Sequence, residues 1–183
     1  MRKVDTRLFR YVCGNFASGV TVVTTRDTAG DVRGMTASAF MFVSVEPRLV
    51  VVSVSERARL RATLDDATEF AVSFLAEDQQ DVSDFFAGRS EALDAAPFVE
   101  IDAGAPPVIE GAPAWMRCRL AAAHRAGDHV LYVGEAMEVW AAEDCARRPP
   151  LVFFRGAYVP IVPQEGTAVD GRPGHLAVAG PLA

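Results

Sequence analysis

The sequence is short of the residues and motifs that mark the commonest catalytic and metal-binding sites. Of its 183 residues, three are cysteine and three are histidine, and these show no metal-ligand spacing. No GxG, GKS, GKT, HExxH or GxSxG motif occurs. The sequence therefore lacks the dinucleotide fingerprint of the Rossmann fold, the P-loop, the zincin helix and the nucleophile elbow. These absences exclude most hydrolase and metalloenzyme interpretations.

Basic charge and long apolar runs are also scarce. Lys3 is the only lysine, and the net charge of −6 at pH 7 disfavours nucleic acid as the principal partner. No apolar run approaches the roughly 20 residues that a membrane-spanning helix needs. The chain start does not resemble a signal peptide, and an odd number of dispersed cysteines is typical of a reducing compartment. We expect a soluble, cytoplasmic protein with neither a nucleic-acid nor a membrane partner.

The remaining composition is that of one globular domain, with 50% hydrophobic and 23% charged residues. A chain of this length can bury a substantial core. Proline and glycine become frequent near the C-terminus, where apolar periodicity is lost. We expect one domain over residues 1–160 and a Pro/Gly-rich tail over residues 161–183.

Apolar spacing and turn residues predict the elements of this domain. Helices are expected after a cap at Asp5 or Thr6, over about ten residues after Ser55, and from a cap at Asp78 to Gly88. Strands are expected over 19–25, 33–40, 49–54, 69–75, 114–123, 130–139 and 151–159. The order does not alternate as βαβ, so we predict a mainly β fold: an antiparallel barrel of about six strands with peripheral helices.

The first candidate site segment is Gly34–Ser38. Thr36 and Ser38 would point to the same face of a strand, because side chains alternate along it. Their hydroxyls and nearby backbone N–H groups could hydrogen-bond the edge of a flat, partly apolar ligand. The alternative is an ordinary solvated strand face.

The second candidate segment is Ser53–Arg61. A helix start attracts anions through its unpaired N–H groups and its dipole. Ser55 at the cap, with Arg57, Arg59 and Arg61 behind it, could hold a phosphate, although three arginines that alternate along a helix cannot all face one ligand. The alternative is a capped surface helix with exposed arginines.

The third candidate segment is Gly127–His129, at the end of the predicted hairpin. A largely neutral histidine there could donate or accept one hydrogen bond with a carboxamide or a pyrophosphate. The alternative is a turn histidine that bonds its own loop. Phe85 and Phe86 could likewise pack on a ligand ring or simply belong to the core.

Seven segments, in the same order as in the family, resemble the short-chain flavin reductases. They are residues 16–24, 34–40, 43–47, 70–75, 85–88, 126–129 with 134–135, and 154–158. The resemblance extends over about residues 8–158. It implies an FMN-binding split β-barrel that pairs as a homodimer, with flavin near the subunit interface.

The resemblance also implies which residues form the site. Flavin, FAD or FMN, would be held by Met35, Thr36, Ala37, Ser38, Ser53, Val54, Ser55, Arg59, Leu60 and Phe86. NADH or NADPH would be met by Gly127, Asp128, His129 and Tyr158. Many relatives have asparagine where Ala37 stands and serine where Arg59 stands, so the choice between FAD and FMN stays open.

The function implied by the resemblance is NAD(P)H:flavin oxidoreduction. Hydride would pass from the reduced nicotinamide to the flavin without an obligatory acid or base, since the cofactors carry the chemistry. Diffusible reduced flavin would then serve a separate flavin-dependent monooxygenase. Two alternatives are a split-barrel protein with permanently bound flavin, acting as an electron carrier or a quinone or metal reductase, and a non-enzymatic flavin-binding module.

Overall fold

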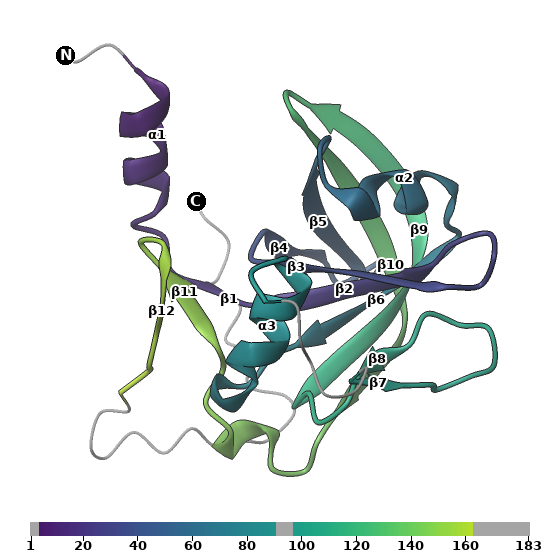
Figure 1. The fold of residues 1–183 in the computed structure, drawn as a ribbon. Helices are drawn as coiled ribbons and strands as arrows, with labels where there is room; N and C mark the ends of the chain where they lie inside the picture. Colours follow the sequence, from purple (N-terminus) through teal and green to yellow (C-terminus); the bar gives the residue numbers. More distant parts are fainter. Residues whose placement is uncertain (1–3, 91–96, 163–183) are drawn as a thin grey trace.

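A computed structural model describes residues 4–90 and 97–162, and its largest element is an antiparallel sheet of seven strands (Figure 1). The strands are β2 (Thr21–Arg26), β3 (Val32–Ala37), β4 (Phe40–Ser44), β5 (Leu49–Ser55), β6 (Glu69–Phe74), β9 (Ala114–Ala126) and β10 (His129–Ala141). Their order in the sheet is β3-β2-β6-β9-β10-β5-β4, so the two edge strands follow one another in the chain. The predicted mainly β fold with peripheral helices is confirmed.

Two smaller sheets and three α-helices surround this sheet (Figure 1). The small sheets are formed by β1 (Ser18–Gly19), β11 (Val152–Phe154) and β12 (Ala157–Val159), and by β7 (Phe98–Val99) and β8 (Val108–Ile109). The helices are α1 (Thr6–Cys13), α2 (Arg59–Asp66) and α3 (Gln80–Phe86), with 3₁₀ turns η1 (Glu77–Gln79) and η2 (Cys145–Arg147). Among the described residues, every helix is too short or too polar to cross a membrane.

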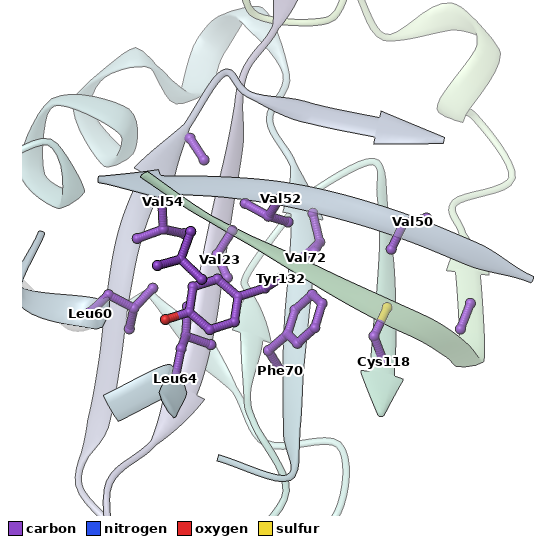
Figure 2. Close-up of a cluster of buried hydrophobic side chains, with 13 residues drawn as sticks. Val23, Val50, Val52, Val54, Leu60, Leu64, Phe70, Val72, Cys118 and Tyr132 are labelled. Carbon is purple, nitrogen blue, oxygen red and sulfur yellow. The ribbon is translucent and has the colours of Figure 1, made fainter. Parts of the chain in front are cut away.

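The core lies where the main sheet curves around its own buried face. In β5 every second side chain is buried, Val50, Val52 and Val54, because side chains alternate along a strand. These valines pack with Phe70 of β6 and with Leu60, Leu64 and Tyr132 from α2 and β10 (Figure 2). Neighbouring side chains of β9 differ in the same way: Cys118 is fully buried and Arg119 is exposed.

Three of the predicted strands are each divided in two, and those predictions were wrong. The strand expected over 19–25 is divided at Val20 between β1 and β2, which belong to different sheets. The strand expected over 33–40 ends at Ala37, residues 38 and 39 form a bend, and β4 follows as a separate edge strand. The strand expected over 151–159 turns at Arg155 and Gly156, whose φ angles are 50° and 86°. Glycine tolerates positive φ without strain, so this pair makes a tight hairpin between β11 and β12.

The predicted helix starts are partly right. Asp5 caps α1, and its Oδ1 accepts from the N–H of Leu8 at 2.7 Å. Ser55 does not cap α2, because it is the last residue of β5 and Ala58 occupies the cap position. Asp78 lies inside η1 rather than at a cap. Gly88, at φ 70°, ends α3 as predicted, and most of the predicted tail lies outside the described residues.

Candidate functional site

Three loops meet at one end of the main sheet. The N–H of Ser53 donates to the carbonyl oxygen of Ala39 at 3.0 Å, which joins β5 to the bend after β3. The N–H of Glu56 donates to the carbonyl oxygen of Asp128 at 3.0 Å, which joins the β5–α2 loop to the β9–β10 turn. Within the sheet His129 lies opposite Ser55. The bend (residues 38–39), the segment from β5 to the start of α2 (residues 53–59) and the turn (residues 127–129) therefore form one continuous edge, which we call the rim.

The predicted ligand residues of β3 and its bend differ in what they offer. The hydroxyl of Thr36 donates to the carbonyl oxygen of Ser83 in α3 at 2.6 Å, so it can only accept from a ligand. Ala37 is buried, and its carbonyl accepts the Thr21 hydroxyl at 2.8 Å. Met35 is half-buried against the core. Ser38 is exposed, and its hydroxyl has no recorded partner among residues 4–90 and 97–162.

Thr36 and Ser38 do not form the hydroxyl pair on one strand face that alternation predicted. Ser38 lies outside β3, in the bend, where strand alternation no longer applies. It nevertheless lies on the rim, next to the Ala39 carbonyl that holds β5. The segment is thus placed at the candidate site by its bend rather than by a strand face.

The segment that joins β5 to α2 supplies the apolar floor and a positive charge of the candidate site. Val54 and Leu60 are core residues with 0% and 3% exposure. Ser55 accepts the N–H of Arg57 at 3.3 Å, which tightens the loop before α2. The side chains of Ser53 and Arg59 have no recorded hydrogen-bond or ion-pair partner in the described part of the chain. A phosphate at this helix start would therefore meet a serine hydroxyl and an uncompensated guanidinium.

Phe86 approaches β3 at Gly34. A Cβ added at Gly34 would lie 2.7 Å from Cε1 of Phe86, so only glycine permits this approach without displacement. The ring is held by Phe85 and Phe98, with centroid separations of 5.0 and 5.6 Å. Phe86 is half-buried and so is a core residue that borders β3, which fits both of the roles considered for it.

The predicted nucleotide turn is built by Gly127, which adopts a φ of 66°. Asp128 follows, and its Oδ1 lies 2.8 Å from Nδ1 of His129. The hydrogen bond and charge of His129, with a smaller effect from Arg57, hold the pKa of Asp128 below its usual value. Asp128 stays anionic and orients the imidazole, whose Nε2 has no recorded partner in the described chain. That nitrogen is available to a ligand.

Tyr158 does not contact this turn in the described chain. It lies in β12, where its hydroxyl is 2.8 Å from Oγ of Ser83 and 3.1 Å from Oδ1 of Asp84. Arg89 stacks over its ring, 5.8 Å from the centroid. Tyr158 therefore supports α3, and its contact with a nicotinamide nucleotide stays a prediction.

Sequence reasoning did not single out Ser83. It is fully buried, its carbonyl oxygen accepts from the Thr36 hydroxyl, and its own hydroxyl is hydrogen-bonded to the Tyr158 hydroxyl. Ser83 therefore fixes α3 against β3 and β12. Nothing in the local pattern distinguishes it from a solvated helix serine. The buried surroundings come from strands far away in the sequence.

A cavity of about 720 Å³ lies elsewhere, between the end of α2, the β2–β3 turn and residues 103–106. Its two arginines are already engaged. Arg26 is paired with Glu100, and Arg117 lies 2.5 Å from Asp102 and 3.1 Å from Glu138. A cavity whose cations are paired offers little to an anionic ligand, so we place the site at the rim. In the described chain, no three His, Cys, Asp or Glu residues are grouped as a metal site.

Several known proteins are similar to this chain. The family model described as "Flavin reductase like domain" matches residues 13–161. A protein named "NADH-dependent flavin reductase" from Rhodococcus sp is 40% identical over 151 residues, covering 81% of this chain and 82% of its own length. The "4-hydroxyphenylacetate 3-monooxygenase, reductase component" of Thermus thermophilus is 44% identical over 150 residues, covering 82% and 93%.

A solved structure shares the fold. The structure described as "Flavin reductase PheA2 in native state" superimposes with a TM-score of 0.80 at 41% sequence identity. The match covers 87% of this chain and 100% of that one. The matched region contains every segment of the rim.

Proposed function

This chain belongs to the flavin reductase-like family, and we propose that it is an NAD(P)H-dependent flavin reductase. Hydride would pass from C4 of the reduced nicotinamide to N5 of FAD or FMN, leaving oxidised nicotinamide and reduced flavin. The observation that carries the proposal is the rim, which holds the side chains of Ser38, Ser53 and Arg59, without a partner among residues 4–90 and 97–162, and the imidazole of His129, oriented by Asp128. Bound flavin supplies the redox chemistry, and the protein supplies binding and orientation.

Each part of the rim has a distinct task in this proposal. Ser38 and Ser53 hydrogen-bond the flavin, and Arg59 pairs with its phosphate at the start of α2. Met35, Thr36, Ala37, Val54, Ser55 and Leu60 form the wall and floor beneath it, and Phe86 flanks it. Gly127, Asp128 and His129 hold the nicotinamide nucleotide, with Tyr158 as a further predicted contact.

We propose that the reduced flavin leaves the protein and serves a separate flavin-dependent monooxygenase. The Thermus relative carries the name of such a reductase component. Exposure of the site fits an exchangeable ligand: Ser38, Arg59 and Asp128 are all exposed in the described structure. A permanently bound flavin is the second candidate, and extensive dialysis followed by flavin quantification separates the two, since an exchangeable flavin is lost.

We also propose that the main sheet closes as a split barrel and that two copies pair. The edge strands β3 and β4 are joined through the bend, whose Ala39 carbonyl accepts from β5. Large apolar side chains are exposed on α1 and on β4, among them Phe9, Val12, Met41 and Phe42. An eight-residue helix with no buried residue is marginal in water by itself, so α1 needs a covering surface. A second copy supplies one, and sedimentation measures the dimer.

The decisive assay follows NADH absorbance with the purified protein, alone and after addition of FMN or FAD. We expect oxidation of NADH that requires both protein and flavin, with a rate that saturates in each substrate. Oxidation that is independent of protein, or no oxidation with either flavin and with both NADH and NADPH, contradicts the proposal. A protein that quenches flavin fluorescence yet oxidises neither nucleotide is a binding module instead.

A further inference from the structure

Tyr132 is a buried polar group that the proposed chemistry does not use. It lies in β10, three residues after His129, and is 1% exposed. Figure 2 shows its ring among Val54, Leu60 and Leu64, with the hydroxyl oxygen on the side of the two leucines of α2. A phenol so deeply buried needs a hydrogen-bond partner, because an unsatisfied hydroxyl is costly in a core.

The partner of Tyr132 is in α2. Its hydroxyl donates to Oδ1 of Asp65 at 2.5 Å and lies 3.3 Å from the carbonyl oxygen of Arg61. Oδ2 of Asp65 in turn pairs with the guanidinium of Arg61 at 2.8 Å. Burial, and then the hydrogen bond to Asp65, raise the pKa of Tyr132 to about 12, so the phenol remains a donor at neutral pH.

Helix α2 has few other anchors. Of its eight residues only Leu60 and Leu64 are buried, and its cap residue Ala58 makes no side-chain hydrogen bond. The loop before it is tied to the β9–β10 turn through the N–H of Glu56. Two leucines allow a short helix to rock, whereas a directional bond near its C-terminal end fixes its axis.

We infer that Tyr132 is a positioning residue for flavin, which locks α2 to β10 through Asp65 and so aims the α2 N-terminus at the flavin phosphate. The inference rests on the proposed function, since it assigns Arg59 and the helix start to that phosphate. Because β10 begins with His129, the same bond also fixes the position of the proposed phosphate site at the start of α2 relative to the proposed nucleotide site at His129. Tyr132 itself contacts neither ligand.

The test is Tyr132→Phe, which removes one oxygen and keeps the ring. We expect the Kd for flavin, from fluorescence quenching, to rise about 3- to 10-fold, the size of effect given by one lost hydrogen bond. At saturating flavin and NADH, kcat should change less than about twofold, and the KM for NADH likewise, because β10 keeps its sheet partners. This split between flavin affinity and turnover is not expected from general destabilisation.

Three further variants identify the bond itself. Asp65→Asn retains a partner for Tyr132 and should keep the flavin Kd within about twofold, whereas Asp65→Ala, which also removes the ion pair with Arg61, should raise the Kd at least as much as Tyr132→Phe. The double variant Tyr132→Phe with Asp65→Ala should bind flavin no more weakly than Asp65→Ala, because the hydrogen bond is already absent there.

Thr24→Val is the matched control. Its hydroxyl is also fully buried and donates to the carbonyl oxygen of Pro107 at 2.5 Å, away from α2. It should lower the unfolding free energy comparably and leave the flavin Kd unchanged. If wild-type protein binds and reduces flavin while Tyr132→Phe binds it as tightly, the inference fails alone. If wild-type protein neither binds nor reduces flavin, the inference fails together with the proposed function.

Discussion

Replacing Gly34 by alanine tests the packing of α3 against the candidate flavin strand. The new Cβ would lie 2.7 Å from Cε1 and 2.9 Å from Cδ1 of Phe86, whereas ordinary contact begins at 3.4 Å. The ring must therefore retreat by about 0.7 Å. Phe85 and Phe98 already contact it, so the retreat strains the packing of Phe86 against the buried residues Val82 and Ile109.

Overpacking of this kind costs about 1–3 kcal/mol. We expect Gly34→Ala to lower the unfolding free energy by that amount, measured by urea denaturation at unchanged slope. Because Phe86 flanks the proposed flavin position, the flavin Kd should rise as well. Gly19→Ala is the matched control: it also lies in a strand, and an added Cβ there meets nothing within 4 Å.

A second substitution makes the cause testable. Phe86→Leu shortens the side chain that the new Cβ would meet, so its destabilisation and that of Gly34→Ala should not add. The double variant should be more stable than the sum of the single effects predicts. A Gly34→Ala protein within about 0.5 kcal/mol of wild type, the usual range of harmless surface changes, would refute the reasoning.

Three further predictions follow from the same structure. Cys118 is fully buried, and burial raises its pKa to about 12, so iodoacetamide should leave Cys118 unmodified in the folded protein and reach it only after denaturation; mass spectrometry of the native protein decides this. The pKa of Tyr132 is raised from 10.0 to about 12. The contribution of the neutral phenol to stability is therefore complete below pH 10 and is lost as pH rises toward 12. Denaturant titrations should show the difference in unfolding free energy between wild type and Tyr132→Phe shrinking by on the order of 2 kcal/mol over that pH range. His129→Ala should raise the KM for NADH several-fold with a small change in kcat, and unchanged NADH kinetics would remove the nucleotide role of His129.

The regular strands were predictable because their pattern is local. In β9 the apolar residues Cys118 and Leu120 are more buried than Arg119 between them, and that alternation is visible in the sequence. The Asp5 cap and the Gly88 stop are likewise single-residue effects that act within one turn. Such features need no knowledge of the neighbouring elements.

The breaks in regular structure were not predictable in the same way. The bend after Ala37 exists because the Ala39 carbonyl accepts from Ser53 in another strand, a contact that no local pattern encodes. Ser55 looks like a helix cap in the sequence, yet it continues β5 because His129 pairs with it across the sheet. Tertiary hydrogen bonding decided both positions, and both belong to the candidate site.

The serine and threonine hydroxyls differ in whether they remain available to a ligand. Thr21, Thr24 and Thr36 lie within strands, and each hydroxyl donates to a backbone carbonyl of a neighbouring segment. Ser38 and Ser53 flank the bend, and neither hydroxyl has a recorded partner in the described chain. Polar groups within a buried strand form hydrogen bonds inside the protein, because a buried polar group without a partner destabilises the fold. The two hydroxyls that have no such partner in the described chain lie at the bend or beside it, so we expect a ligand that needs hydrogen-bond donors to bind at the rim and not within the core.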